Sequence, residues 1–164
     1  MAVTHKLIQT ISVGVGGAAS IDFTSIPTTY TDLLLVMSAR STDLSQLIIK
    51  FNNTATTYTT IHVNGSGSAA SSNNNATAGY IVGSTATASV FGSNSYYIPN
   101  YAGSTQKSYS VDSVTENNAT SATQHFGAGL WNGTSAINQI TFTIFSSGNF
   151  AQYTSASLYG ILKS

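Results

Sequence analysis

Charged side chains are scarce in this sequence. Five residues are Lys or Arg and five are Asp or Glu, so charged residues make up 6% of the 164 positions and the formal net charge is zero. In a soluble globular chain, about a quarter of the residues are usually charged. Five scattered cations cannot form the basic surface with which proteins neutralise phosphates, so the sequence argues against nucleic-acid binding.

Cysteine is absent and proline is rare. Without Cys the chain can form no disulfide, no thiolate zinc site and no cysteine nucleophile. The two prolines, Pro27 and Pro99, lie between the strands predicted below, where a missing N–H costs no ladder hydrogen bond. Neither of them interrupts a predicted strand.

Long apolar runs are missing as well. The longest is Leu33 to Met37, far shorter than the roughly 20 residues that cross a bilayer as a helix. Residues 6–19 have the outline of a signal peptide, but Gln9, Thr10 and Ser12 interrupt its apolar part. We therefore expect no membrane segment and interpret the N-terminal region as a strand.

The sequence is rich in alternating apolar and polar residues. Hydrophobic residues make up 41% of the chain, beside 48 Ser and Thr and 13 Asn, and no window has the 3.6-residue period of a helix. The predicted strands cover residues 6–13, 18–23, 31–39, 46–51, 58–63, 79–82, 86–91, 106–114, 123–131, 137–145 and 156–162. Short strands separated by Gly, Ser, Asn and Pro turns predict an all-β fold, an antiparallel β-sandwich of jelly-roll-like type. The length predicts a single domain over residues 1–164.

In two of these strands the apolar pattern predicts which faces are buried. Residues 31–39 are apolar on both faces, because Leu34 and Val36 alternate with Leu33 and Leu35, so we expect this strand in mid-sheet with cover on each side. Residues 137–145 alternate instead. Their apolar members should face the core while the threonines face solvent.

A low-complexity segment, residues 64–77, reads NGSGSAASSNNNAT. With no large apolar side chain to bury, it is predicted to be a surface loop. It lies within a longer uncharged region, since the 56 residues between Lys50 and Lys107 include no Lys, Arg, Asp or Glu. A third of the chain therefore has no fixed charge.

The sequence contains partial motifs for nucleotide and metal binding, but the residues around them do not match those that such sites require. Residues 14–19 and 65–70 both match G-x-G-x-x-A, but this motif binds a pyrophosphate only when a helix follows it, and here a strand or more loop is predicted. His5, His62 and His125 have no metal-ligand spacing. We expect neither a cofactor nor a metal.

Catalytic constellations are equally weak. There is no G-x-S-x-G motif, and five acids leave few ways to orient a histidine base. The acids are Asp22, Asp32, Asp43, Asp112 and Glu116. Asp112 and Glu116 are the closest pair in sequence, with nothing else to mark them as a glycosidase pair. We expect no enzymatic activity and assign no catalytic residue.

Aromatic residues form the more informative group. Tyr96, Tyr97, Tyr101 and Trp131 lie in or beside segments rich in Gly, Ser and Asn. Such aromatics can form a stacking platform for sugars or a protein interface, or they can close the open ends of the sandwich. Both interpretations stay open. As interface candidates we take these four residues together with His5, Lys6 and Leu7 at the chain end, which is free to reach a neighbour.

Three segments carry a resemblance to a known group of proteins. They are residues 21–40 (IDFTSIPTTYTDLLLVMSAR), residues 126–150 (FGAGLWNGTSAINQITFTIFSSGNF) and residues 155–163 (SASLYGILK). The sequence resembles the small β-sandwich virion proteins of tailed bacteriophages, especially those of aquatic hosts, whose chains often finish on a Leu-Tyr-Gly-Ile strand. The resemblance includes no catalytic signature and assigns no residue a role.

The resemblance implies a non-enzymatic structural protein of the virion. Its first implication is a decoration (cement) protein on the capsid surface, a homotrimer that binds the major capsid protein and stabilises the head shell. The alternative is a tail or fibre tip module that binds a host receptor or a glycan. Zero net charge agrees with a chain that works in an assembly, because a free monomer would lack charge repulsion against self-association.

Overall fold

The computed structural model of the chain describes residues 4–54, 58–74, 77–118, 121–145 and 148–162. In those ranges the regular structure consists of β-strands, and no helix is present. The strands are β1 (His5–Ser12), β2 (Ser20–Phe23), β3 (Asp32–Ala39), β4 (Gln46–Phe51), β5 (Tyr58–Gly65), β6 (Ala70–Asn74), β7 (Gly79–Tyr80), β8 (Gly92–Ile98), β9 (Lys107–Glu116), β10 (Ala122–Trp131), β11 (Ile140–Ile144) and β12 (Ser155–Ile161). The predicted all-β fold is confirmed.

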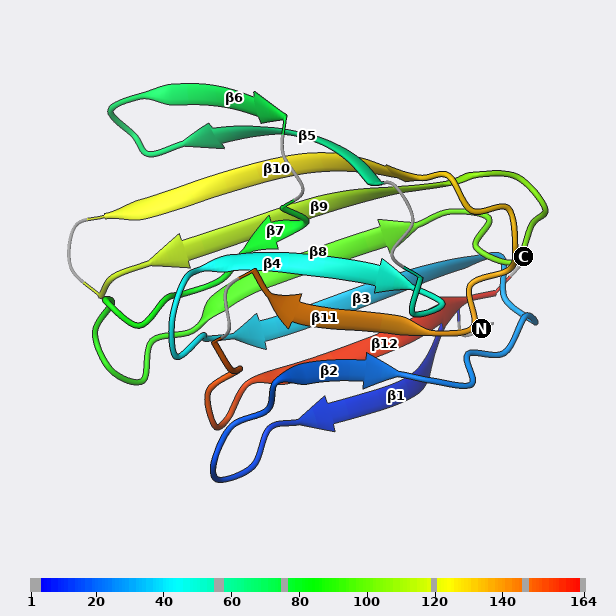
Figure 1. The fold of residues 1–164 in the computed structure, drawn as a ribbon, viewed down its shortest axis with the longest axis horizontal. Coiled ribbons are helices and arrows are strands. Elements are labelled where there is room, and N and C mark those ends of the chain that lie inside the picture. The colour runs from blue at the N-terminus through cyan, green and yellow to red at the C-terminus, as the bar shows by residue number, and fades with distance from the viewer. Residues whose placement is uncertain (1–3, 55–57, 75–76, 119–120, 146–147, 163–164) are drawn as a thin grey trace.

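The strands form two antiparallel sheets that pack face to face (Figure 1). The larger sheet has the order β1-β12-β3-β8-β9-β10-β5-β6, and the smaller sheet has the order β2-β11-β4-β7. The architecture is therefore the β-sandwich that the alternating sequence predicts.

Eight of the strands have jelly-roll connectivity. Without β5, β6, β9 and β10, the larger sheet reads β1-β12-β3-β8 and the smaller sheet reads β2-β11-β4-β7. Numbered from 1 to 8 along the chain, these strands are ordered 1-8-3-6 against 2-7-4-5, the two Greek keys of a jelly roll. The hairpins β5–β6 and β9–β10 are additions, and both extend the larger sheet beyond β8.

The core lies between the two sheets and follows from the alternation of the strands. In β3 and β4 every second residue is buried. Phe23, Phe51, Phe142 and Phe150 are all fully buried. Because the side chains of a strand alternate between faces, the sequence correctly predicted Ile140, Phe142 and Ile144 of β11 as core residues. The prediction that both threonines of β11 face solvent is wrong for Thr141, which is 6% exposed, because neighbouring β2 covers it and its hydroxyl donates to Asp22.

The β5–β6 hairpin lies beyond the smaller sheet. The smaller sheet ends at β7, which has only two residues, and Figure 1 shows the hairpin continuing past it. Every residue of β6 is exposed. Thr60 and His62 of β5 are still buried, so β6 is the strand at this end that lies without cover among the described residues.

Three strand predictions differ from the structure. Residues 70–74, predicted as loop, form β6, because polar Ser and Asn residues pair with β5 although they show no apolar alternation. Residues 92–98 form β8, which the prediction missed. Residues 86–91 form no strand: the Arg40 guanidinium donates hydrogen bonds to the carbonyls of Ala86, Thr87 and Val90, so this segment folds around a side chain instead of joining a sheet.

The predicted cover on both faces of residues 31–39 is also wrong. Leu33 and Leu35 are fully buried, but Val36 is 38% exposed and Leu34 is half-buried. The second face of β3 belongs to the outer surface of the larger sheet, and among the described residues no third layer covers it. Its apolar side chains therefore contribute to a surface and not to a second core.

Candidate interaction surface

The outer face of the larger sheet exposes a group of apolar side chains on β5 and β10. We define the β5–β10 patch as Ile61, Val63, Phe126 and Leu130, which are 55%, 50%, 56% and 42% exposed. Phe126 lies directly opposite Val63 in the strand register, so their side chains are neighbours on one face. Contiguous exposed apolar side chains on a soluble domain mark sites of interaction.

The surroundings of the patch are polar but almost uncharged. β5, β6 and β10 contain no Lys, Arg, Asp or Glu. The nearest carboxylate in the register is that of Asp112 on β9, opposite Phe126, and it accepts a hydrogen bond from the Gln124 side-chain amide. A partner at this surface would be held by apolar burial and by backbone, hydroxyl and amide hydrogen bonds.

A second exposed group lies on the same outer face around Tyr97, which is 39% exposed. Its hydroxyl donates to Asp32 Oδ2 over 2.8 Å, and the backbone N–H of Asn100 donates to Asp32 Oδ1 over 2.8 Å. The hydrogen bond to Asp32 raises the pKa of the Tyr97 hydroxyl, because ionisation would give up that bond. Tyr97 is thus held in place with part of its ring in solvent.

The other predicted interface residues divide into two groups. His5, Lys6 and Leu7 are exposed on β1, the edge strand at the opposite end of the larger sheet from the β5–β10 patch. Their interface role, like that of Tyr97, stays a prediction. Tyr96, Tyr101 and Trp131 are 0%, 0% and 2% exposed. Their assignment to an interface is wrong, because their side chains lie in the core.

Each of the three buried aromatics has a packing role. Tyr96 faces Phe142 with ring centroids 5.0 Å apart, and Trp131 meets Phe51 edge-on at 5.6 Å. The Tyr101 hydroxyl donates to the carbonyl of Pro27. The sequence left open whether these aromatics closed the core or faced a partner. Closing the core is what the structure shows for these three.

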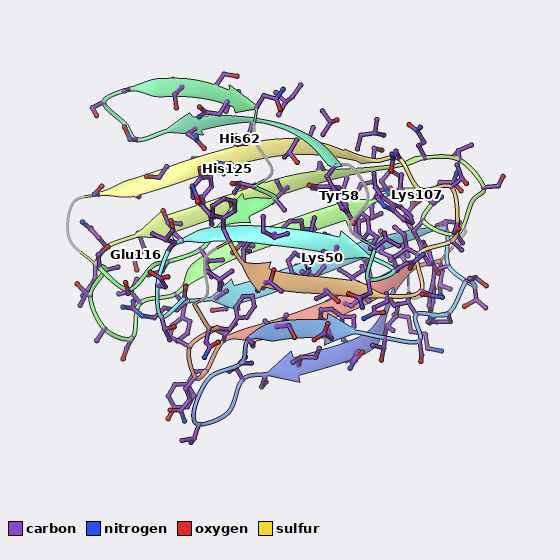
Figure 2. All side chains as sticks on the ribbon, in the orientation of Figure 1. Lys50, Tyr58, His62, Lys107, Glu116 and His125 are labelled. Carbon is purple, nitrogen blue, oxygen red and sulfur yellow. The ribbon has the colours of Figure 1, made fainter. Side chains whose placement is uncertain are left out.

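The structure brings together two histidines that the sequence left apart. His62 on β5 and His125 on β10 are both 1% exposed, and their ring centroids are 4.6 Å apart. Tyr80 of β7 packs against both rings, with its ring centroid 4.6 Å from that of His125. His62 lies opposite Gly127 and His125 lies opposite Asn64, so the pair exists only through the β5–β10 pairing (Figure 2).

Burial keeps this histidine pair neutral. Desolvation lowers the pKa of His62, and desolvation together with the neighbouring His62 lowers the pKa of His125 to about 4. The Asn64 side-chain oxygen is hydrogen-bonded to His125 Nδ1, while both ring nitrogens of His62 and Nε2 of His125 have no hydrogen-bond partner among the residues that the structure describes. A cavity of about 300 Å³ borders His125 and is lined also by Ser45, Asn64, Tyr80, Thr115 and Thr123.

The surroundings of the histidine pair are uncharged where the structure describes them. Among the described residues, those that line the adjoining cavity include no carboxylate. Within the described ranges, no three His, Cys, Asp or Glu side chains gather as they would around a metal ion. Asp22, Asp112 and Glu116 each accept hydrogen bonds from protein groups, such as the Thr141 hydroxyl on Asp22. The acids considered as catalytic candidates thus have local structural contacts.

Two of the five cations serve the fold itself. Lys107 is 1% exposed, and its ammonium group donates to the carbonyls of Gly103, Thr105 and Thr134. Burial lowers the pKa of Lys107. Arg40 binds the segment that follows Gly83, as described above. The hydrogen-bonding groups of both cations are thus directed to main-chain carbonyls of their own chain.

The first glycine motif has a structural explanation. Residues 14–19 form the connection between β1 and β2, where Gly16 and Gly17 have φ values of 95° and 78°. Glycine adopts this left-handed region without steric cost. A strand follows, as predicted, so the amides of a helix N-terminus are not available to bind a pyrophosphate.

Compared with known protein families, curated proteins and solved structures, the chain matches none. Among the described residues, no helix has the length and hydropathy needed to cross a membrane.

Proposed function

We propose that this protein is a non-enzymatic structural protein of a bacteriophage virion that decorates the capsid surface and binds the major capsid protein. The observation that carries the proposal is the β5–β10 patch, where Ile61, Val63, Phe126 and Leu130 form an exposed apolar surface on strands without fixed charge. In this proposal the outer face of the larger sheet docks onto the shell. The proposal includes no catalytic step, cofactor or nucleic acid.

Two further features of the chain support this assignment. The sequence resembles small β-sandwich virion proteins in the three segments given above, and the jelly roll is an architecture on which capsid and lectin domains are built. The jelly roll supports the assignment as an analogy of fold. The proposal therefore depends on the patch and must be tested there.

The test compares two exposed phenylalanines. Phe126 belongs to the β5–β10 patch, whereas Phe145 lies just after β11 and does not belong to the patch. Each side chain is 56% exposed. Phages that carry Phe126→Ser should lose most of the protein from purified heads, while phages that carry Phe145→Ser should keep it. Equal occupancy of both variants would overturn the role of the patch. Absence of the wild-type protein from the heads would overturn the proposed function.

A tail tip module is the alternative, and Tyr97 is the observation that favours it. An exposed tyrosine ring beside the Asp32 carboxylate and the Asn100 backbone has the composition of a sugar-stacking site. Copy number separates the two functions, because decoration requires hundreds of copies in each particle and a tail tip only a few dozen. The expected homotrimer stays a prediction, since a single chain includes no three-fold contact.

A further inference from the structure

β6 is an unprotected edge of the larger sheet. Among the described residues β6 pairs with β5 alone, so its other side presents main-chain N–H and C=O groups to solvent. All five of its residues, Ala70 to Asn74, are exposed. An open edge of this kind is a template for pairing with another strand.

The other edges of the two sheets are protected. β1 includes Lys6 and has a bulge between Leu7 and Gln9. In the smaller sheet, β2 has four residues and β7 has two. Charge, bulges and short length are the usual means by which proteins prevent edge-to-edge pairing. β6 has neither a charged residue nor a proline, and its register with β5 is regular.

The composition around β6 favours an identical strand as the partner. At a two-fold axis each side chain meets a copy of the same surface, so a charged edge repels itself. β6 and the two strands next to it, β5 and β10, have no Lys, Arg, Asp or Glu. Three consecutive strands without charge are therefore compatible with self-pairing at no electrostatic cost.

We propose that β6 pairs antiparallel with β6 of a second copy, about a two-fold axis that passes beside Ser72. This register pairs all five residues, with Ser71 opposite Asn73 and Ser72 opposite its own copy. Hydroxyl and amide side chains can form hydrogen bonds across such a pair. The two larger sheets then become one continuous sheet, and both β5–β10 patches lie on the same face of it.

The contact is small, and its affinity should be low. Five residue pairs bury less surface than a standard stable interface, so we expect a dimer that forms in the micromolar range. On a particle, neighbouring copies held by another interface would pair at high effective concentration. The inference concerns the free edge alone and does not depend on the proposed capsid role.

Single cysteines provide a direct test, because the natural chain has none. Side chains directly opposite each other on antiparallel strands have Cβ atoms about 4.5–5.5 Å apart, close enough for a disulfide after a small adjustment. Ser72→Cys should therefore form a covalent dimer under mild oxidation. A mixture of the Ser71→Cys and Asn73→Cys proteins should form a crosslink faster than either protein alone. Ser110→Cys, exposed in the middle of the sheet on β9, is the control and should crosslink at least about tenfold more slowly than Ser72→Cys.

Sedimentation equilibrium of the cysteine-free protein supplies the second measurement. Wild type should show a monomer–dimer equilibrium between about 1 and 300 μM, and Ser72→Lys should weaken it at least tenfold by placing two like charges at the axis. Ser110→Lys should leave it unchanged. A monomer throughout, a trimer, or equal crosslinking of Ser72→Cys and Ser110→Cys would overturn the proposal. Because these measurements use purified protein, their failure would leave the capsid proposal standing.

Discussion

His62 and His125 come from different strands, yet their rings lie 4.6 Å apart with almost no exposure to solvent. Tyr80 closes the pair from the smaller sheet. Their pKa values are lowered because burial penalises the charged imidazolium. Tyr80 packs against both rings, and the other described residues that line the cavity beside His125 are Ser45, Asn64, Thr115 and Thr123, none of which is a carboxylate.

The first prediction is a loss of stability in mild acid. The unfolded chain binds protons at both histidines near pH 6.5, whereas folded His125 does so only near pH 4. The unfolded state therefore binds more protons between these values, and the free energy of unfolding falls as the pH is lowered through this window. Chemical denaturation at pH 7, 5.5 and 4.5 measures the effect. Equal stability at all three values would contradict a buried neutral pair.

The second prediction separates the two histidines. Within the described part of the chain, both ring nitrogens of His62 lack a hydrogen-bond partner, whereas His125 is hydrogen-bonded to Asn64. His62→Phe should keep the packing, leave stability at pH 7 unchanged or raised by up to about 1 kcal/mol, and reduce the pH dependence. His125→Phe should lower stability, because Asn64 then loses its partner. If His62→Phe proved the more destabilising, the nitrogens of His62 would have partners after all.

The third prediction concerns Gly129. A Cβ at this position would lie 2.1 Å from Tyr109 Cζ and so would overlap the Tyr109 ring. A Cβ on Gly65 would have no atom within 4 Å. Gly129→Ala should therefore destabilise the fold by about 1–3 kcal/mol through overpacking. Gly65→Ala, the matched control on the paired strand, should change stability by less than about 0.5 kcal/mol. Thermal unfolding followed by near-UV circular dichroism compares the two variants.

The fourth prediction concerns the buried ammonium group of Lys107. Lys107→Met keeps the aliphatic length but leaves the carbonyls of Gly103, Thr105 and Thr134 without their shared donor. The expected cost is roughly 2–4 kcal/mol in the free energy of unfolding. Lys50→Met on β4 is the control, because Lys50 is only half-buried, and its effect should be smaller. Similar losses for both variants would argue against a special role for Lys107.

The fifth prediction concerns salt. An interface on the β5–β10 patch has few charges to screen, so binding to stripped heads should change less than about tenfold between about 50 and 500 mM salt. A steep loss of binding with added salt would contradict an uncharged interface.

Two variants test the predicted interface residues at β1 and Tyr97. Truncation of residues 1–4, which precede β1, and the substitution Tyr97→Ala should each lower occupancy on the particle without unfolding the domain. Full occupancy by both variants would show that neither β1 nor Tyr97 contributes to the interface.

The sequence by itself determined the strand content and which side of most strands faces the core. These are local properties, because alternation with a period of two is written into each segment. The alternation in β4 and β11 was enough to identify the apolar core residues of both strands, although Thr141 of β11 is buried as well. The composition likewise determined that any interface contains few charged residues.

Only the tertiary structure decided which strands are neighbours, and with them every candidate site. Tyr96 and Tyr97 are adjacent in sequence, yet one is in the core and the other in solvent, since the register of β8 sets their faces. The His62–His125 pair depends on the pairing of β5 with β10, and the open edge depends on β6 being last in the sheet. Strand pairing joins residues far apart in the chain, and no local period encodes the partner.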